Sequence, residues 1–297
     1  MEKMLKCSVG VMAYNEEKNI SRLLEALLSQ KLRDVEISEI IVVASGCTDR
    51  TEEIVRDFSE NDHRIRLLWQ EKREGKASAV NLWLKSASAE ILILESADTI
   101  PEKDTLEKLV QPLRDPKVGM TGAHPVPTND PKTFMGFAAH LLWNLHHHIS
   151  LKNPKMGEMV AFRKVISEIP QDTAVDEASI EVTVKKLGYQ VKYAPEVIVR
   201  NRGPENVRDF LKQRRRIQAG HLELQKKEGY KVSTTNPGKI LAALFRNFSL
   251  DWRFVIFTPL VITLEIWGRI LGWYDWRFKK KKHSIWEIAE STKKLSG

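Results

Sequence analysis

Short apolar runs alternate with amphipathic stretches through the first hundred residues of the chain. The runs have the length of β-strands, and we expect strands at 8–13, 39–44, 64–69 and 90–94. Between them, apolar residues recur at helical spacing over 20–28, 51–58 and 77–87. Strands that alternate with helices predict an α/β fold, with a mostly parallel central sheet flanked by helices on both faces.

The pattern changes after residue 98, where longer helices separate the strands. Pro101 is expected to open a helix that runs to about residue 113. The remaining expected elements are a strand at 118–123, a proline-rich turn at 125–127, an apolar helix at 133–149, a strand at 159–162, a helix at 178–187 that ends at Gly188, a strand at 190–194 and a basic helix at 206–227.

The last sixty residues differ in composition from the rest. An apolar run at 254–264 is shorter than a membrane-spanning helix requires, but Trp252, Trp267, Trp273, Tyr274 and Trp276 flank it and lysines 279–282 follow. Interfacial aromatics beside a lysine run predict a helix that lies at a membrane surface. The alternative is a soluble helical subdomain with a solvated tail. We therefore expect one domain over 1–232 and a helical, membrane-associating region over 233–297.

Positive charge is concentrated in the C-terminal third of the chain. Residues 200–297 hold 21 Lys and Arg against 9 Asp and Glu, a net charge of +12, whereas residues 1–199 carry a net −4. This asymmetry indicates an anionic partner for the C-terminal third: phosphates, nucleic acid or a lipid surface. The chain has two cysteines and no recognisable secretory signal, which favours a cytoplasmic location for the domain at 1–232.

Four polar segments adjoin expected strands and should gather at one edge of the sheet, where open α/β sheets bind ligands. They are Tyr-Asn-Glu-Glu at 14–17, Ser-Gly-Cys-Thr-Asp at 45–49, Gly-Lys-Ala at 75–77 and Ser-Ala-Asp at 96–98. Asn15 and Glu17 either cap a helix and occupy its first turn, respectively, or read a nucleobase or ribose. Lys76 precedes the helix expected from residue 77, beside free N–H groups that suit a diphosphate; the alternative is an exposed lysine at a helix start. Asp98 is placed to hold Mg²⁺ or Mn²⁺, unless it caps the next helix.

Two further clusters come later in the chain. Asp176 and Glu177 are adjacent carboxylates before a helix, and either can act as a general base; acidic residues are also common in a first helical turn. Gln213 and Arg216 share one helix face, within a run of three arginines that suits either a diphosphate or solvent. Histidines 146–148 diverge by about 100° per residue, so we expect no shared metal ion there.

In this order, the segments resemble those of the family 2 glycosyltransferases, which are inverting enzymes of the GT-A fold. The resemblance covers residues 7–228 and points to the membrane-associated, cellulose-synthase-like branch. The family's Asp-x-Asp metal motif corresponds to Ser96-Ala97-Asp98, and its acidic Glu-Asp motif to Asp176-Glu177 in reversed order. The Gln-x-x-Arg-Trp motif of processive members resembles 213–217, where Ile217 replaces the tryptophan.

The resemblance implies transfer of a sugar from a nucleotide-diphosphate donor, taken to be a UDP-sugar, to a glycan or polyprenyl-linked acceptor. Asp98 would hold Mg²⁺ or Mn²⁺, and Asp176 or Glu177 would act as base, with Asp176 preferred. The implied donor-binding residues are Ala13, Asn15, Glu17, Ser45, Lys76, Ser96, Asp98, Gln213 and Arg216. The implied location is the cytoplasmic side of the cell membrane.

Two other classes of function remain open. A catalytically impaired protein that binds a nucleotide or acts as a scaffold is favoured by Ser96, which replaces a metal carboxylate. A nucleic-acid binder would explain the basic helix but not the acidic residues at the sheet edge, so we expect no nucleic-acid partner.

Overall fold

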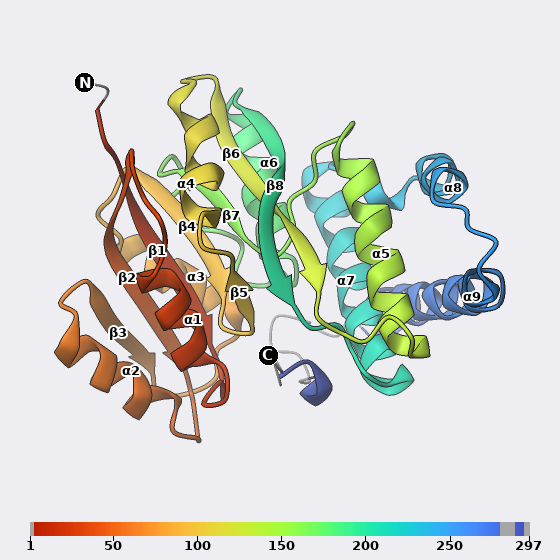
Figure 1. The fold of residues 1–297 in the computed structure, drawn as a ribbon, viewed down its shortest axis with the longest axis horizontal. Coiled ribbons are helices and arrows are strands. Elements are labelled where there is room, and N and C mark those ends of the chain that lie inside the picture. Colours follow the sequence, from red (N-terminus) through yellow and green to blue (C-terminus); the bar gives the residue numbers. More distant parts are fainter. Residues whose placement is uncertain (1–2, 280–288, 294–297) are drawn as a thin grey trace.

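An eight-stranded mixed sheet forms the centre of the protein (Figure 1). The computed structural model describes residues 3–279 and 289–293. The strand order is β3-β2-β1-β4-β7-β6-β8-β5, and neighbours are parallel except at the β4–β7, β7–β6 and β8–β5 pairs. The strands are β1 (Leu5–Ala13), β2 (Val35–Ser45), β3 (Ile65–Gln70), β4 (Ile91–Ser96), β5 (Thr99–Pro101), β6 (Val118–Pro127), β7 (Val160–Arg163) and β8 (Gln190–Asn201).

Helices cover both faces of the sheet, as the alternating pattern predicts. One apolar core joins α1, α2 and α4 to the sheet, and a second joins α3 and α6 to its other face. Gly10 of β1 lets α3 approach closely, since a Cβ atom at this position would overlap the Trp83 ring. The described α-helices are α1 (Ile20–Leu28), α2 (Thr51–Asn61), α3 (Lys76–Ser86), α4 (Thr105–Val110), α5 (Phe134–Ser150), α6 (Asp176–Lys186), α7 (Val207–Glu228), α8 (Pro237–Arg246) and α9 (Trp252–Tyr274).

The parallel strands β2, β1 and β4 end at the same edge of the sheet. Their register pairs Ala13 with Ala44 and Met12 with Ser96. Ala13, Ser45 and Ser96, which come from distant parts of the sequence, therefore lie on neighbouring strand ends. This edge is the one at which the sequence predicts a ligand site.

Two sequence predictions that involve proline are wrong. Pro101 does not open a helix: it ends β5, which pairs with β8, and α4 begins at Thr105. The expected turn at 125–127 is instead the end of β6. There β6 pairs with β8 on one side only, because its pairing with β7 stops at Gly122. A strand that pairs on one side tolerates prolines, which cannot donate a second set of ladder hydrogen bonds.

Helix α9 packs along α7 through two glycines. A Cβ at Gly268 would lie 2.6 Å from the Arg214 Cβ atom, and one at Gly272 would lie 2.7 Å from the Arg215 carbonyl oxygen. Asp275, 1% exposed, accepts hydrogen bonds from the Arg215 guanidinium at 2.6–2.9 Å. The C-terminal helices also pack on α5 through an apolar cluster. The domain boundary after residue 232 stays a prediction.

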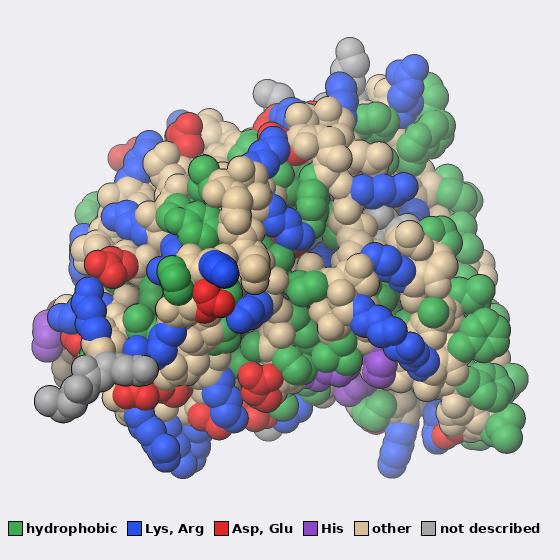
Figure 2. All heavy atoms as spheres, turned by 90° about the horizontal axis from the view of Figure 1, so that it is seen from above, with side chains coloured by type: hydrophobic (Ala, Val, Ile, Leu, Met, Phe, Trp, Pro, Cys, Tyr) green, Lys and Arg blue, Asp and Glu red, His purple; other side chains and the backbone are tan. Residues whose placement is uncertain are grey.

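The outer face of α8 and α9 is apolar and exposed. Figure 2 shows hydrophobic side chains gathered along this side of the molecule. The exposed large apolar side chains of α8, α9 and the residues next to them include Phe245, Leu250, Trp252, Trp267 and Phe278. The apolar run that the sequence sets at 254–264 is part of a longer helical stretch. Residues 252–278 are long and apolar enough to cross a membrane by length and composition, and little of this stretch is buried. Lysines 280–282 of the basic run lie outside the described residues.

The close α7–α9 contact predicts a stability difference between two glycine substitutions. Gly272→Ala should lower the free energy of unfolding by about 1–3 kcal/mol, because its Cβ meets backbone that cannot move aside. Gly238→Ala in α8 is the matched control: its nearest neighbour is Asn236 Oδ1 at 3.4 Å, so a change within about 1 kcal/mol is expected. Urea denaturation measures both, and equal effects would mean that α9 does not dock tightly on α7.

Candidate active site

A cavity of about 1290 Å³ opens at the carboxyl edge of the sheet. Its walls come from the ends of β1, β2 and β4, the starts of α3 and α6, helices α5 and α7–α9, and segment 289–293. The fold therefore brings most of the expected site residues together, although they are widely separated in the sequence. Nine of the eleven line the cavity: Ala13, Ser45, Lys76, Ser96, Asp98, Asp176, Glu177, Gln213 and Arg216.

Asn15 and Glu17, the other two expected site residues, lie outside the cavity lining and hold the loop after β1 in place. The Asn15 side chain donates to Thr48 Oγ1 at 3.1 Å and accepts from the Thr48 backbone N–H at 2.8 Å. The Glu17 backbone N–H donates to Asp49 Oδ2 at 3.1 Å. These bonds join the loops after β1 and β2. Neither residue caps α1, whose N-cap position is Asn19.

Tyr14 and Glu16, which belong to the expected segment at 14–17 but not to the expected site residues, line the cavity beside them. Asn15 lies between these two residues with a φ of +52°, in the left-handed region that asparagine adopts more readily than most residues. The turn at Asn15 thus directs its own side chain to the β2 loop while both neighbours face the cavity.

The Lys76 ammonium group connects three parts of the site. Its Nζ atom donates to Glu177 Oε1 at 2.9 Å and to Ser96 Oγ at 3.3 Å, and it lies 3.5 Å from Asp176 Oδ2. Burial opposes the charge on Lys76, but the two carboxylates outweigh it and raise the pKa of the ammonium group. Lys76 therefore stays charged and holds the start of α6 against the end of β4.

The two adjacent carboxylates have different environments. Burial raises the pKa of Asp176 to about 6, although Lys76 acts in the opposite direction. Burial acts on Glu177 as well, but the Lys76 ammonium prevails and lowers the pKa of that carboxyl. Asp176 is 2% exposed, and its Oδ1 atom has no hydrogen-bond partner among the described residues. A pair of acids whose pKa values are pushed apart is typical of a site with separate roles for each.

Glu158 and Glu95 are two further carboxyl groups within electrostatic reach of Asp98. Burial, followed by the charges of Asp98 and Glu177, raises the pKa of Glu158 to about 7. Burial and the charge of Glu158 raise the pKa of the fully buried Glu95. Glu158 lines the cavity, and sequence reasoning missed it. It lies in a loop without a motif, and the pairing of β7 with β4 brings it to the site.

The residues around Asp98 fit a divalent ion only if another molecule supplies ligands. Among the described residues, no three or more His, Cys, Asp or Glu side chains are grouped so as to hold a metal. Ser96 Oγ already accepts a hydrogen bond from Lys76. Asp98 does not cap the next helix, which begins at Thr105. Mg²⁺ is commonly held by one or two carboxylates together with substrate phosphates and water, and Asp98 is compatible with that arrangement.

The three consecutive arginines of α7 all line the cavity, but they have different partners. Arg216 lines the cavity, where burial lowers its pKa and the charges of Asp176 and Glu177 act in the opposite direction. Arg215 forms its ion pair with Asp275, and Arg214 faces α9. Of the three, Arg216 is therefore the residue whose surroundings best suit the expected contact with a diphosphate.

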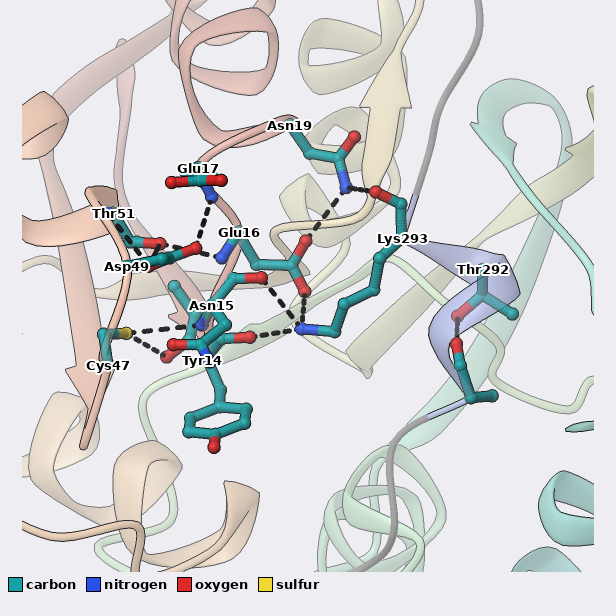
Figure 3. Close-up of polar contacts among 12 residues, drawn as sticks. Tyr14, Asn15, Glu16, Glu17, Asn19, Cys47, Asp49, Thr51, Thr292 and Lys293 are labelled. Carbon is teal, nitrogen blue, oxygen red and sulfur yellow. Dashed lines mark hydrogen bonds and ion pairs between the residues drawn. The ribbon is translucent and has the colours of Figure 1, made fainter.

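The C-terminal segment 289–293 forms part of the cavity wall (Figure 3). Lys293 Nζ donates to the Tyr14 carbonyl oxygen, to the Asn15 carbonyl oxygen at 3.1 Å and to Glu16 Oε1 at 2.8 Å. Ser291 donates to Asp209 at the start of α7. The segment thus joins the loop after β1 to α7. No local pattern in the sequence indicates this contact.

The three consecutive histidines also diverge, as helical geometry predicts. His146 is buried and lines the cavity. His147 stacks on His124 with ring centroids 4.1 Å apart and hydrogen-bonds the Tyr193 hydroxyl at 2.8 Å. His148 bonds the Asn144 carbonyl oxygen at 2.9 Å. The three rings therefore have three separate environments.

Two family models match the chain. "Glycosyl transferase family 2" matches residues 8–169, and "Glycosyl transferase family group 2" matches residues 91–276. A poly-beta-1,6-N-acetyl-D-glucosamine synthase of Staphylococcus epidermidis is 25% identical over 293 residues, which cover 94% of this chain and 69% of that protein.

Solved structures share the fold. A mannosyltransferase from Pyrobaculum calidifontis, in complex with GDP-Man and Mn²⁺, matches with a TM-score of 0.64 and 22% identity over 93% of this chain and 88% of that one. S. aureus TarS 1-349 in complex with UDP-GlcNAc gives a TM-score of 0.53 and 18% identity over 92% and 80%. These likenesses establish the GT-A fold that the sequence predicts.

The raised pKa of Glu158 predicts how stability varies with pH. The folded state holds a proton on Glu158 up to about pH 7, whereas the unfolded state loses it near 4.5, so the free energy of unfolding should fall as pH rises between these values. Glu158→Gln should make this fall shallower and raise stability at pH 8 by roughly 1–3 kcal/mol. Urea denaturation at several pH values measures the slope. Glu90→Gln, at an exposed position, is the control, and an unchanged slope in Glu158→Gln would contradict the assignment.

Proposed function

The chain belongs to glycosyl transferase family 2, and we propose that it moves a sugar from a nucleoside-diphosphate donor to an acceptor hydroxyl with inversion. The observation that carries the proposal is the Lys76–Asp176–Glu177 arrangement at the cavity. It provides one carboxylate held by an ammonium group and a second carboxylate with an unpaired oxygen.

Asp176 is the proposed general base. The acceptor oxygen would attack the anomeric carbon as the bond from that carbon to the diphosphate breaks, and the acceptor proton would pass to Asp176. A pKa of about 6 leaves Asp176 ionised at neutral pH and makes it a stronger base than an ordinary aspartate. Glu177 and Lys76 act as positioning residues, because they hold the start of α6 and tune the charge at Asp176.

The donor is proposed to lie across the ends of β1, β2 and β4. Its nucleoside would contact Ala13, Ser45 and Ser96 at these strand ends. Gln213 and Arg216 would face the diphosphate, whose leaving charge a guanidinium stabilises. Asn15 and Glu17 would act indirectly, by holding the loop beside the nucleoside.

We propose UDP as the carrier of the sugar. The neighbour bound to UDP-GlcNAc supports this choice, and so does the N-acetylglucosamine polymer named for the S. epidermidis relative. The neighbour bound to GDP-Man makes GDP the alternative to test.

Asp98 is the proposed protein ligand for Mg²⁺ or Mn²⁺. The ion, when bound, would supply positive charge to the departing diphosphate. Support comes from the position of Asp98 in the cavity and from the Mn²⁺ in the mannosyltransferase complex. Since Asp98 is a single carboxylate, the ion should bind only when the nucleotide contributes its phosphate oxygens.

The acceptor is proposed to be a glycan or a polyprenyl-linked molecule at the cytoplasmic face of the cell membrane. The exposed apolar surface of α8 and α9 supports membrane contact. The ion pair between Asp275 and Arg215 holds α9 along the domain, which favours a helix that lies at the surface over one that spans. A nucleotide-binding scaffold without turnover is the second candidate, favoured by Ser96 in place of a carboxylate.

The base assignment predicts different results for two neighbouring variants. Asp176→Asn should lower kcat by at least about 100-fold while donor affinity is kept. The wild-type kcat/KM should fall as pH drops below about 6, where Asp176 gains a proton. Glu177→Gln should shift this fall in kcat/KM to lower pH, because the Glu177 charge raises the pKa of Asp176. Release of UDP from UDP-N-acetylglucosamine measures both. Full activity in Asp176→Asn would place the base elsewhere.

The metal assignment predicts that nucleotide and ion stabilise the protein together. UDP with Mn²⁺ should raise the melting temperature, and at 100 times its dissociation constant a ligand adds about 2.7 kcal/mol. UDP alone, Mn²⁺ alone and Asp98→Ala with both ligands should give much smaller shifts. GDP in place of UDP tests the carrier. A wild-type enzyme that binds UDP equally well without Mn²⁺ would remove the metal from the proposal.

A further inference from the structure

A group of basic side chains lines the part of the cavity next to α9. Lys155 comes from the loop between α5 and β7, Arg214 and His221 from α7, and Arg269 from α9. They lie within electrostatic reach of one another: burial, then the charges of Lys155, Arg269 and Arg214, lower the pKa of His221. Burial also lowers the pKa of Lys155, and Arg214 adds to that effect.

Acidic partners balance only part of this charge. Glu265 of α9 accepts from Arg269 Nε at 2.8 Å and lies 3.7 Å from Arg214 Nη1. Lys155 makes no ion pair or hydrogen bond with any residue that the structure describes, although the charge of Glu181 acts on it from a distance. The Arg214 Nε atom is also buried, and it has no hydrogen-bond partner among the described residues. Like charges held together in a partly buried cavity repel one another, and a bound anion would relieve that repulsion.

His146 gives a second, independent indication of a ligand. Its side chain is 7% exposed and lines the cavity, and neither ring nitrogen has a hydrogen-bond partner among the described residues. Burial, followed by the charge of Lys155, lowers its pKa, so the ring is neutral and carries one N–H donor. Buried polar groups normally have partners, so an unpaired imidazole at a cavity wall is a candidate for a hydrogen bond to a bound ligand.

An apolar wall continues from this basic group to the outside of the molecule. Leu241 of α8 and Ile262 and Ile266 of α9 line the cavity, yet they are 55%, 38% and 53% exposed. They belong to the exposed apolar side chains of α8 and α9. On α9, Glu265 and Arg269 lie one helical turn apart beside this apolar row. The same cavity therefore offers positive charge inside and hydrocarbon contact toward the surface.

We propose that this pocket binds the phosphate of a lipid-phosphate acceptor, with Lys155, Arg214 and His146 on the phosphate and the hydrocarbon chain leaving along the apolar wall. The inference rests on the proposed function at one point only, which is the identification of this ligand as the acceptor. Lys155 is also within electrostatic reach of Glu177, so a group carried on the phosphate would be near the catalytic carboxylates.

Calorimetric titration of the full chain with farnesyl phosphate, below its micelle concentration, tests the pocket without turnover. Inorganic phosphate and farnesol test each half of the ligand alone, and farnesyl phosphate should bind at least tenfold more tightly than either. Lys155→Met and Arg214→Met should each weaken it at least tenfold, whereas Lys152→Met, an exposed lysine of the same loop, should not. Circular dichroism checks that each variant is folded.

Three results would overturn the inference. Inorganic phosphate that binds as tightly as farnesyl phosphate would indicate a site for free phosphate. Equal weakening by Lys152→Met would indicate non-specific attraction. Displacement of farnesyl phosphate by UDP with Mn²⁺ would assign the basic group to the donor. Because UDP binding is measured on the same samples, loss of the lipid site and loss of the donor site are distinguishable.

Discussion

The site depends on the ion pairs that the Lys76 ammonium group makes with Asp176 and Glu177. Asp176 is almost fully buried, and Glu177 is only 19% exposed. Two adjacent carboxylates in such a place would repel one another and lose hydration, which a single cation within 3.5 Å offsets. Lys76 can reach both because it is the first residue of α3, at the sheet edge. There its ammonium group also donates a hydrogen bond to Ser96 Oγ of β4. The cation therefore links the sheet edge to α6 and leaves one carboxylate oxygen for chemistry.

Local pattern was enough to predict the elements that carry most of the site. The expected helix at 20–28 is α1, and the ends of β1, β2 and β4 lie close to where alternation and apolar runs place them. Glu158, Lys155 and Lys293 could not be predicted in this way. Each belongs to a segment without periodicity and reaches the cavity through long-range packing: β7 beside β4, and segment 289–293 beside the loop after β1. The helix predicted to begin at Pro101 was wrong because Pro101 lies in an edge strand, which pairs on one side only and therefore tolerates proline.

The fold brings the acidic and basic parts of the sequence together at the cavity. The acidic N-terminal part contributes carboxylates to one side of the cavity, and the basic C-terminal part contributes arginines from α7 and α9. Arg215 is neutralised within the protein by Asp275, whereas Arg216 faces the cavity, where an anionic substrate would complete the balance. Acidic and basic parts that meet at one cavity suit a reaction in which a proton is taken at one wall and a diphosphate leaves at another.

The α7–α9 contact connects that chemistry to the outer surface. Gly268 and Gly272 bring α9 so close to α7 that Arg214 and Glu265 share one wall of the cavity. Elsewhere on α9, Trp267 is exposed together with other large apolar side chains. One helix therefore presents polar groups to the cavity and apolar groups to the surroundings. In the proposed reaction, a lipid-anchored acceptor held against that apolar surface would not need to leave the membrane to bring a hydroxyl to the carboxylates, because the cavity opens beside it.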